Sequence, residues 1–277
     1  VPPDIVARRL GTALESRLGE KVVVTNRPGA ATALAMGVLA QSPADGYTLL
    51  HSPVTPLTIL PHRMDNLNYT LDAIVPVCQN FDNPFVLVAS PKVPVKDFQS
   101  AVALAKSKPG SVRYLVPGIS TSPHLAAAEL WLRLGVQAGE IAFNGEAAGN
   151  VALLAGEPEL GMVQPATVIA QKLTPIAVFA EKRLRAFPQT PTVIELGVPI
   201  RPAGYGGIFV RAGTPEAIVA RLEAACREAS SDKDYREFIE QIQHAEVNYL
   251  DSKAFAARIR EEYASKERLL KQLNLPK

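Results

Sequence analysis

The sequence has few residues of the types that usually hold metals or cofactors. Its 277 residues include two cysteines and four histidines, namely Cys78, Cys226, His51, His62, His124 and His244. The histidines are too scattered for an HExxH motif or a close metal pair, and the cysteines form no CxxC motif. Free cysteine often behaves as a small buried hydrophobe, so we expect two separate thiols, with a disulfide as the alternative. We expect no metal site and no cofactor.

The sequence also lacks the short motifs of nucleotide-binding proteins and hydrolases. It contains no GxSxG, so the nucleophile elbow of an α/β-hydrolase is absent. It contains neither GxxxxGK[ST] nor GxGxxG, and the turn at Pro28–Gly29 is followed by alanines instead of further glycines. We therefore expect no phosphate-binding loop and no catalytic residue.

Long apolar runs and charge asymmetry are missing as well. No apolar run reaches the roughly 20 residues of a membrane helix. The 29 basic and 27 acidic residues are spread along the chain, with a net charge of +2, which argues against a nucleic-acid partner. The first residues, "VPPDIVARRL", read as an amphipathic helix and not as a signal peptide, so we expect a leader and a first strand to precede them.

What is present is a repeated alternation of strands and helices. Residues 4–18 read as a helix, 21–25 as a short buried strand, 30–40 as a small-residue helix and 48–52 as a strand. The alternation restarts with a strand at 85–89 and a helix at 95–107, and it continues to about residue 200. A helix with Thr214 as its N-cap and a charged helix over 252–274 complete the chain.

This order predicts an α/β protein of two lobes, each a mostly parallel sheet flanked by helices, with a ligand cleft between the lobes. We expect residues 1–90 with 203–277 to form the first lobe, and residues 91–202 to form the second.

One loop has the composition of an anion site. In "PGISTSPHLAAAEL", Gly118, Ser120, Thr121 and Ser122 come directly before a helix with Pro123 in its first turn. The N–H groups and partial positive charge of a helix N-terminus, together with these hydroxyls, could hold a carboxylate. The alternative is that Ser122 only caps the helix. The loop "HSPVTP", after the strand at 48–52, supplies the hydroxyls of Ser52 and Thr55.

Several motifs, in order, resemble those of the Bug-type substrate-binding proteins of tripartite tricarboxylate transporters. "TNRPGAATALAMGVLAQSPADGYTLL" resembles the family signature, with Thr25 in place of the usual Glu and Ala31 in place of a second Gly. "KPGSVRYLVPGISTSPHLAAAEL", "FPQTPTVIELGVP" and "YGGIFVRAGTPEAIVARL" resemble later family segments. The resemblance covers nearly the whole chain.

The resemblance implies a periplasmic binding protein that closes on a small organic carboxylate, a dicarboxylate or an aromatic acid, and delivers it to membrane transporter subunits. We expect a monomer. The implied ligand-binding residues are Pro3, Asp4, Ser52, Pro53 and Thr55 in the first lobe and Gly118, Ser120, Thr121, Ser122, His124 and Gln164 in the second.

Three positions depart from the family pattern. Gln164 stands where relatives often carry Asp, which disfavours an amino-acid ligand, and His51 and Pro53 replace small residues. Two other functions stay open at this point: a sensory module that signals to a partner, and an enzyme that uses His51 and His124 as its titratable pair.

Overall fold

The computed structural model describes residues 3–107, 109–143, 145–200, 204–244 and 247–273, which fall into two compact units. Unit 1 holds the described residues up to Asp82 and those from Tyr205 to Lys271, and unit 2 is built from Asn83–Gly204 together with Gln272 and Leu273. The chain passes into unit 2 after Asp82 and returns to unit 1 after Gly204, whereas the boundaries expected from the sequence lie after residues 90 and 202. The strand at 85–89 therefore belongs to unit 2.

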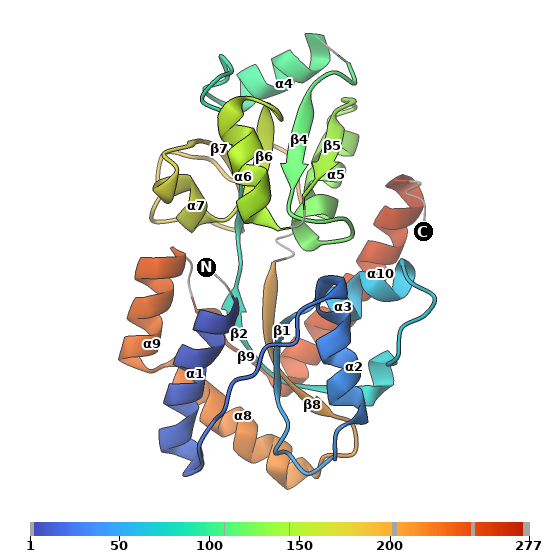
Figure 1. Cartoon of the computed structure of the whole chain (residues 1–277), viewed down its shortest axis with the longest axis vertical. Coiled ribbons are helices and arrows are strands. Elements are labelled where there is room, and N and C mark those ends of the chain that lie inside the picture. The colour runs from blue at the N-terminus through green and yellow to red at the C-terminus, as the bar shows by residue number, and fades with distance from the viewer. Residues whose placement is uncertain (1–2, 108, 144, 201–203, 245–246, 274–277) are drawn as a thin grey trace. The chain divides into compact units, whose positions relative to one another are not determined.

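Unit 1 consists of a sheet with helices on both faces (Figure 1). Its strands are β1 (Leu50–Pro53), β2 (Ile74–Asp82), β8 (Tyr205–Arg211) and β9 (Leu250–Asp251). Its α-helices are α1 (Pro3–Leu18), α2 (Ala33–Gln41), α3 (Thr55–Thr58), α8 (Glu216–Ser230), α9 (Lys233–Phe238) and α10 (Ser252–Leu273). Short helical turns cover Ala30–Thr32, Leu60–His62, Leu71–Ala73 and Ile239–Gln243.

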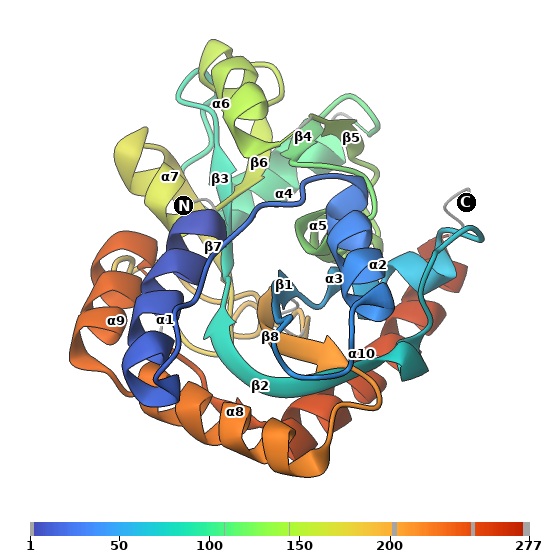
Figure 2. The same ribbon diagram turned by 60° about the horizontal axis from the view of Figure 1, so that its bottom comes forward.

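Alternate residues of β8 point to the two faces of this sheet, as the period of a strand requires. Ile208 and Val210 pack with the apolar sides of α1 and α8. In Figure 2, α8 lies below β2 and α1 stands to its left. Tyr205 and Phe209 pack on the other face with α2 and with Phe255 of α10. The burial of both faces explains why β8 reads as an apolar run and not as an alternating pattern.

The longest strand, β2, has no counterpart in the sequence prediction. Pro76 interrupts its apolar pattern, and a proline normally argues against a central strand because it cannot donate to the ladder. The register between β2 and β8 shifts between Pro76 and Cys78, so the proline lies at a bulge where the missing N–H is tolerated.

Cys78 and Cys226 form a disulfide, so the expectation of two separate thiols is wrong. Their Cα atoms lie 6.6 Å apart although 148 residues separate them in the chain. Cys78 lies on β2 and Cys226 on α8, and both side chains are fully buried where this strand and this helix pack. The separation of the two cysteines in the sequence does not show that β2 and α8 pack against each other, so the disulfide could not be predicted from it. A native disulfide typically stabilises a protein by about 2–4 kcal/mol.

The expected strand at residues 21–25 is also absent from the described structure, where these residues have no assigned strand. The backbone N–H of Val22 donates to the Glu15 carboxylate of α1 at 2.9 Å, and Val23 is 82% exposed. A β-branched run becomes a strand only when a neighbouring strand accepts its ladder hydrogen bonds.

Unit 2 contains a second sheet, in the order β5-β4-β6-β3-β7. Its strands are β3 (Phe85–Ala89), β4 (Arg113–Val116), β5 (Gly139–Ala142), β6 (Leu160–Val163) and β7 (Thr174–Phe179). Its helices are α4 (Phe98–Ser107), α5 (Ser122–Arg133), α6 (Glu146–Ala155) and α7 (Pro165–Ala170). The sequence predicts β3 with the same bounds.

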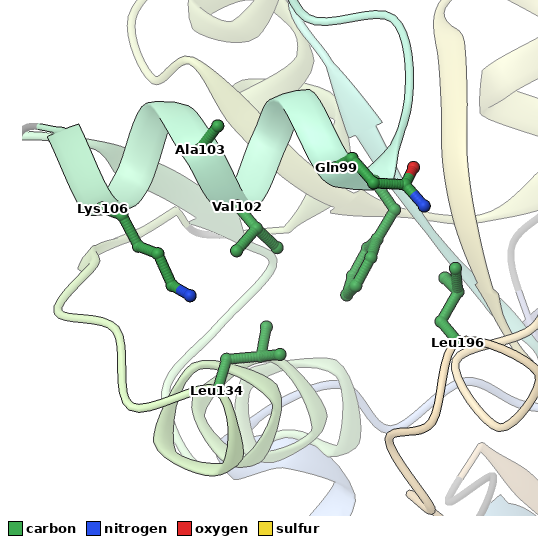
Figure 3. Close-up of a pocket in the computed structure, with 7 residues that line it drawn as sticks. Gln99, Val102, Ala103, Lys106, Leu134 and Leu196 are labelled. Carbon is green, nitrogen blue, oxygen red and sulfur yellow. The ribbon is translucent and has the colours of Figure 1, made fainter.

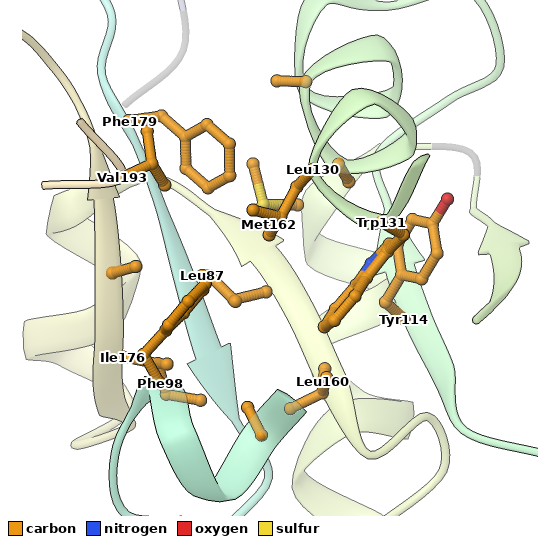
Figure 4. Packing of buried hydrophobic residues seen from close by; sticks show 14 of the residues in the cluster. Leu87, Phe98, Tyr114, Leu130, Trp131, Leu160, Met162, Ile176, Phe179 and Val193 are labelled. Carbon is orange, nitrogen blue, oxygen red and sulfur yellow. The ribbon is translucent and has the colours of Figure 1, made fainter. Parts of the chain in front are cut away.

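Two apolar clusters lie on opposite faces of this sheet. Leu87 of β3 packs with α4, α5 and Trp131, as Figure 4 shows, and Val86 and Val88 pack on the other face with Leu153 of α6. Helices therefore cover both faces of the sheet, and the α/β class with sheets flanked by helices is confirmed.

The expectation of mostly parallel sheets is wrong. Every strand pair described in unit 1 is antiparallel, and in unit 2 β3 runs antiparallel to β6 and β7 while β4 runs parallel to β5 and β6. The reason is the chain path. The chain leaves unit 1 at Asp82 and returns at Tyr205, which are partners in the ladder, so β2 and β8 must run in opposite directions.

Candidate functional site

The carboxyl ends of β5, β4 and β6 lie along one edge of the sheet of unit 2, because β4 pairs in parallel with both neighbours. The helices α6, α5 and α7 follow these strands and begin at the same edge. The first N–H groups of a helix have no partner within it and carry a partial positive charge. This edge therefore combines the N-termini of α5, α6 and α7 with the hydroxyl-rich loop between β4 and α5.

That loop, residues 117–121, has an unusual backbone. Gly118 has φ 147° and Ser120 has φ 57°, a left-handed conformation that L residues rarely adopt. The Thr121 hydroxyl donates to the Gly118 carbonyl at 2.7 Å and closes the turn. The N-cap of α5 is Thr121 and not Ser122, and its side chain makes no capping hydrogen bond in the described structure. Ser122 lies in the first helical turn beside Pro123.

His124 lies behind this loop, with no exposed surface. Its Nδ1 accepts a hydrogen bond from the Ser120 backbone N–H at 3.0 Å. Its Nε2 lies 2.6 Å from Oε2 of Glu140 on β5. Both ring nitrogens are therefore engaged within unit 2, which differs from the predicted direct contact between His124 and a ligand.

Gln164 forms the N-cap of α7 at the same edge. Its backbone N–H donates to both carboxylate oxygens of Glu146 at 3.2 Å, and the Thr167 hydroxyl donates to Glu146 as well. Burial raises the pKa of the Glu146 carboxyl, and the hydrogen bonds from Thr167 and Gln164 oppose this shift. Sequence reasoning missed Glu146. Its place in the first turn of a helix after a strand was the available signal.

In unit 1 the predicted residues Ser52, Pro53 and Thr55 lie where β1 ends and α3 begins. The buried Ser52 hydroxyl donates to the Pro53 carbonyl at 2.8 Å and lies 3.5 Å from the hydroxyl of Thr32. Thr55 is buried in the first turn of α3. The loop "HSPVT" thus meets the turn that precedes α2.

Pro3 and Asp4 begin α1. The Asp4 carboxylate pairs with Arg8 at 3.0 Å and accepts from the Asn26 amide at 2.7 Å. The Arg8 guanidinium, followed by the Asn26 amide, holds the pKa of this carboxyl below its usual range. Asp4 therefore binds the Asn26 end of the signature segment to α1.

His51, the residue before Ser52, is buried at its ring nitrogens. Neither nitrogen has a hydrogen-bond partner of normal geometry among the described residues, and the ring lies 4.9 Å from the ring of Phe81. Burial lowers the pKa of His51 to about 4, against a smaller opposing effect of the nearby Asn80 side chain.

A pocket of about 380 Å³ lies elsewhere in unit 2 (Figure 3). It is lined by Phe98, Gln99, Val102, Ala103 and Lys106 of α4 together with Leu134 and Leu196. None of the predicted site residues lines it, and apart from Lys106 and Gln99 its lining is apolar. It lacks the N–H and hydroxyl donors of the strand edge, so we do not assign the carboxylate site to it.

The described residues offer neither a metal site nor a membrane span. In that part of the chain no group of three His, Cys, Asp or Glu side chains could hold a metal ion. Nor does any helix there have the length and apolar character needed to cross a membrane.

A family model described as "Tripartite tricarboxylate transporter family receptor" matches residues 6–275. The chain belongs to this family. The resemblance inferred from the sequence motifs is thus confirmed, and the chain is an extracytoplasmic solute-binding receptor. The buried disulfide fits that location, since such bonds persist in oxidising compartments.

Alignments with relatives and with solved structures cover most of this chain. The chain is 32% identical over 237 residues to the protein BugT of Bordetella pertussis, an alignment that covers 83% of this chain and 73% of that protein. The structure of the periplasmic binding protein BugD matches with a TM-score of 0.85 and 25% identity, over 99% of this chain and 94% of that chain. The two-lobed periplasmic-binding-protein fold is confirmed.

Two further structures share the fold and were solved with ligands. Rpa4515 of R. palustris with adipate matches with a TM-score of 0.88 and 22% identity, over 99% of this chain and 93% of that one. MatC of Rhodopseudomonas palustris with bound malate matches with a TM-score of 0.82 and 24% identity, over 97% and 94%.

Proposed function

We propose that this receptor captures a small organic carboxylate, a dicarboxylate or an aromatic acid, by closure of its two lobes. It works as a monomer in the periplasm, delivers the acid to the membrane subunits of a tripartite tricarboxylate transporter, and catalyses no reaction. The ligand-binding residues in this proposal are those named from the sequence except His124, whose two ring nitrogens are engaged within unit 2 and which supports the loop without contacting the ligand.

The observation that carries the proposal is the strand edge of unit 2. This edge already binds a carboxylate, that of Glu146, through the Gln164 N–H and the Thr167 hydroxyl at the start of α7. The start of α5 offers the same kind of donors, and its first internal hydrogen bond runs only from the Leu125 N–H to the Thr121 carbonyl at 3.1 Å. A carboxylate from a ligand would be bound there without an arginine.

The receptor family and its ligand-bound structural relatives support the same class of ligand. Adipate and malate, bound by the two relatives, are both dicarboxylates. Because those relatives share the fold at low sequence identity, they support the class and not the individual acid.

The absence of catalysis is supported by the two histidines that an enzyme would use. Both nitrogens of His124 are hydrogen-bonded inside unit 2. Burial lowers the pKa of His51 to about 4, so at neutral pH its ring is uncharged and only weakly basic. Neither side chain is poised for proton transfer to a bound acid.

A thermal-shift and calorimetry screen tests the proposal. The acids are adipate, malate, benzoate and nicotinate, and the matched controls are adipamide and nicotinamide, which keep the shape and lose the charge. We expect at least one acid to raise the melting temperature and its amide to leave it unchanged. A ligand at 100 times its Kd adds about 2.7 kcal/mol of stability.

Variants locate the binding. Replacement of both Ser120 and Ser122 by Ala removes two hydroxyl donors, so we expect about tenfold weaker binding of the acid. Ser107→Ala at the far end of α4 is the matched control and should leave the affinity unchanged. The proposal fails if no acid in the panel stabilises the protein, or if the amides stabilise it equally.

A further inference from the structure

A chain of polar groups runs from the loop 117–121 through the buried His124 to Glu140, whose side chain is 31% exposed. The Ser120 N–H donates to Nδ1 of His124 at 3.0 Å, and Nε2 of His124 lies 2.6 Å from Oε2 of Glu140. The Tyr114 hydroxyl lies 3.4 Å from the same Glu140 oxygen. In Figure 4 the Tyr114 ring lies beside Trp131, and its hydroxyl points out of the apolar cluster. The chain thus joins α5, β5 and β4.

The chemistry of these groups determines where the His124 proton lies. A backbone N–H can only donate, so Nδ1 must be the unprotonated acceptor. The single ring proton of the neutral imidazole then lies on Nε2, and the Glu140 carboxylate accepts it. If the proton moved to Nδ1, two N–H groups would face each other at Ser120.

The loop depends on this arrangement because of its backbone conformation. Ser120 has φ 57°, which an L residue rarely adopts without a compensating contact. The acceptor for its N–H is the side chain of a residue four positions later, fully buried at the start of α5. The hydroxyls of Ser120 and Ser122, which the proposed function assigns to the ligand, lie on or next to this turn, and the Thr121 hydroxyl closes it.

We infer that Glu140 and His124 are positioning residues for the carboxylate site. Glu140 accepts a hydrogen bond from Nε2 and so keeps the ring proton of His124 on that nitrogen. The unprotonated Nδ1 can then accept the hydrogen bond from the Ser120 N–H. This hydrogen bond holds the loop in its binding conformation. Neither residue contacts the ligand. The assignment rests on the proposed function for its consequence in binding, while the hydrogen-bond chain itself is a property of the unliganded protein.

Four substitutions separate the links of the chain. Glu140→Gln keeps a carbonyl oxygen that can accept from Nε2, whereas Glu140→Leu removes the acceptor. His124→Asn keeps an acceptor near the position of Nδ1, whereas His124→Gln keeps only a group near Nε2. Glu129→Leu is the matched control, since it removes a carboxylate of α5 that pairs with Arg133 at 2.7 Å, outside the chain.

The first readout is made without ligand, by nitrogen-15 NMR and amide hydrogen exchange on the full chain. We expect His124 of the wild type to carry its proton on Nε2, and the Ser120 amide to exchange slowly. The Ser120 amide should exchange at least tenfold faster in Glu140→Leu and His124→Gln, and at the wild-type rate in Glu140→Gln, His124→Asn and Glu129→Leu. Equal exchange in Glu140→Leu and the wild type would overturn the inference.

The second readout is the thermal shift produced by 10 mM adipate. The shift should be lost in Glu140→Leu and His124→Gln and retained in the other three variants. If adipate shifts Glu140→Leu as much as the wild type, the loop does not need this chain for binding and the inference is wrong. If none of the acids in the panel shifts the wild type, the proposed function fails, and the exchange rates still decide whether Glu140 and His124 hold the loop.

Discussion

His51 shows how a single buried side chain can make stability depend on pH. Its two ring nitrogens are inaccessible to solvent, although the residue as a whole keeps some exposed surface. The nitrogens carry the charge, so their burial decides the outcome, and the pKa of His51 falls from 6.5 to about 4. The folded protein therefore binds fewer protons than the unfolded chain between these two pH values.

We predict that His51 costs the protein stability as the pH falls. Well above pH 6.5 the residue is neutral in both states and has no effect, and between pH 6.5 and about 4 the unfolded chain gains the proton while the folded protein does not. The loss should reach about 1–2 kcal/mol between pH 6.5 and pH 5. His51→Phe keeps a ring beside Phe81 and removes the titration.

Denaturant unfolding of wild type and His51→Phe at a series of pH values checks this prediction. The difference between the two proteins cancels the titration of all other groups. The variant should gain stability relative to the wild type as the pH falls, and parallel curves would contradict the prediction.

At the scale of elements, the turn between Gly29 and α2 has the most unusual backbone in the described chain. Ala30, Ala31 and Thr32 all have positive φ, at 46°, 48° and 72°. Glycine adopts such angles at little cost, whereas an L residue pays about 1–2 kcal/mol. The family signature has a glycine where this chain has Ala31, so the turn keeps the backbone that the glycine permits.

We predict that Ala31→Gly stabilises the protein. The relief of the left-handed conformation exceeds the extra backbone entropy that glycine loses on folding, with a net gain of about 0.5–1 kcal/mol. Ala33→Gly is the matched control, because Ala33 has φ −58° and is buried in the first turn of α2. It should destabilise by about 1 kcal/mol.

Urea unfolding of both variants is the measurement. The two alanines lie only two positions apart and lose the same methyl group. Changes of opposite sign in the free energy of unfolding would therefore identify the backbone conformation as the cause. A destabilised Ala31→Gly would show that the methyl packing outweighs the strain.

At the scale of the whole molecule, the core of unit 2 comes from one continuous segment, residues 83–204. Both apolar clusters of its sheet consist of residues from this segment alone. In this sheet β3 lies between β6 and β7 and contributes to both clusters. The segment should therefore fold without the rest of the chain, provided that β3 is included.

We predict that a fragment of residues 83–204 unfolds cooperatively, whereas a fragment of residues 91–202 does not. The shorter fragment follows the boundaries expected from the sequence and lacks β3, which leaves β7 without its ladder partner. Circular dichroism during thermal unfolding measures both. A cooperative transition in the shorter fragment would mean that β3 is dispensable for the core.

Much of this architecture could be predicted because it is local. The apolar spacing of α1, the β-branched and aromatic run of β3 and the proline in the first turn of α5 each lie within a few residues of one another. The collinear motifs of the family are local as well. For the site, the composition of the loop 117–121 identified a helix N-terminus rich in donors, and the structure adds Glu146 and Glu140, which come from other parts of the chain.

By itself the sequence determined the α/β class, the family and most helices and strands, because these depend on neighbours in the chain. Only the tertiary structure decided the Cys78–Cys226 disulfide, the antiparallel pairing of β2 with β8 and the inward place of His124. Each of these depends on which distant faces pack together. The spacing of residues along the chain does not show which distant faces pack together, so these features could not be predicted from the sequence.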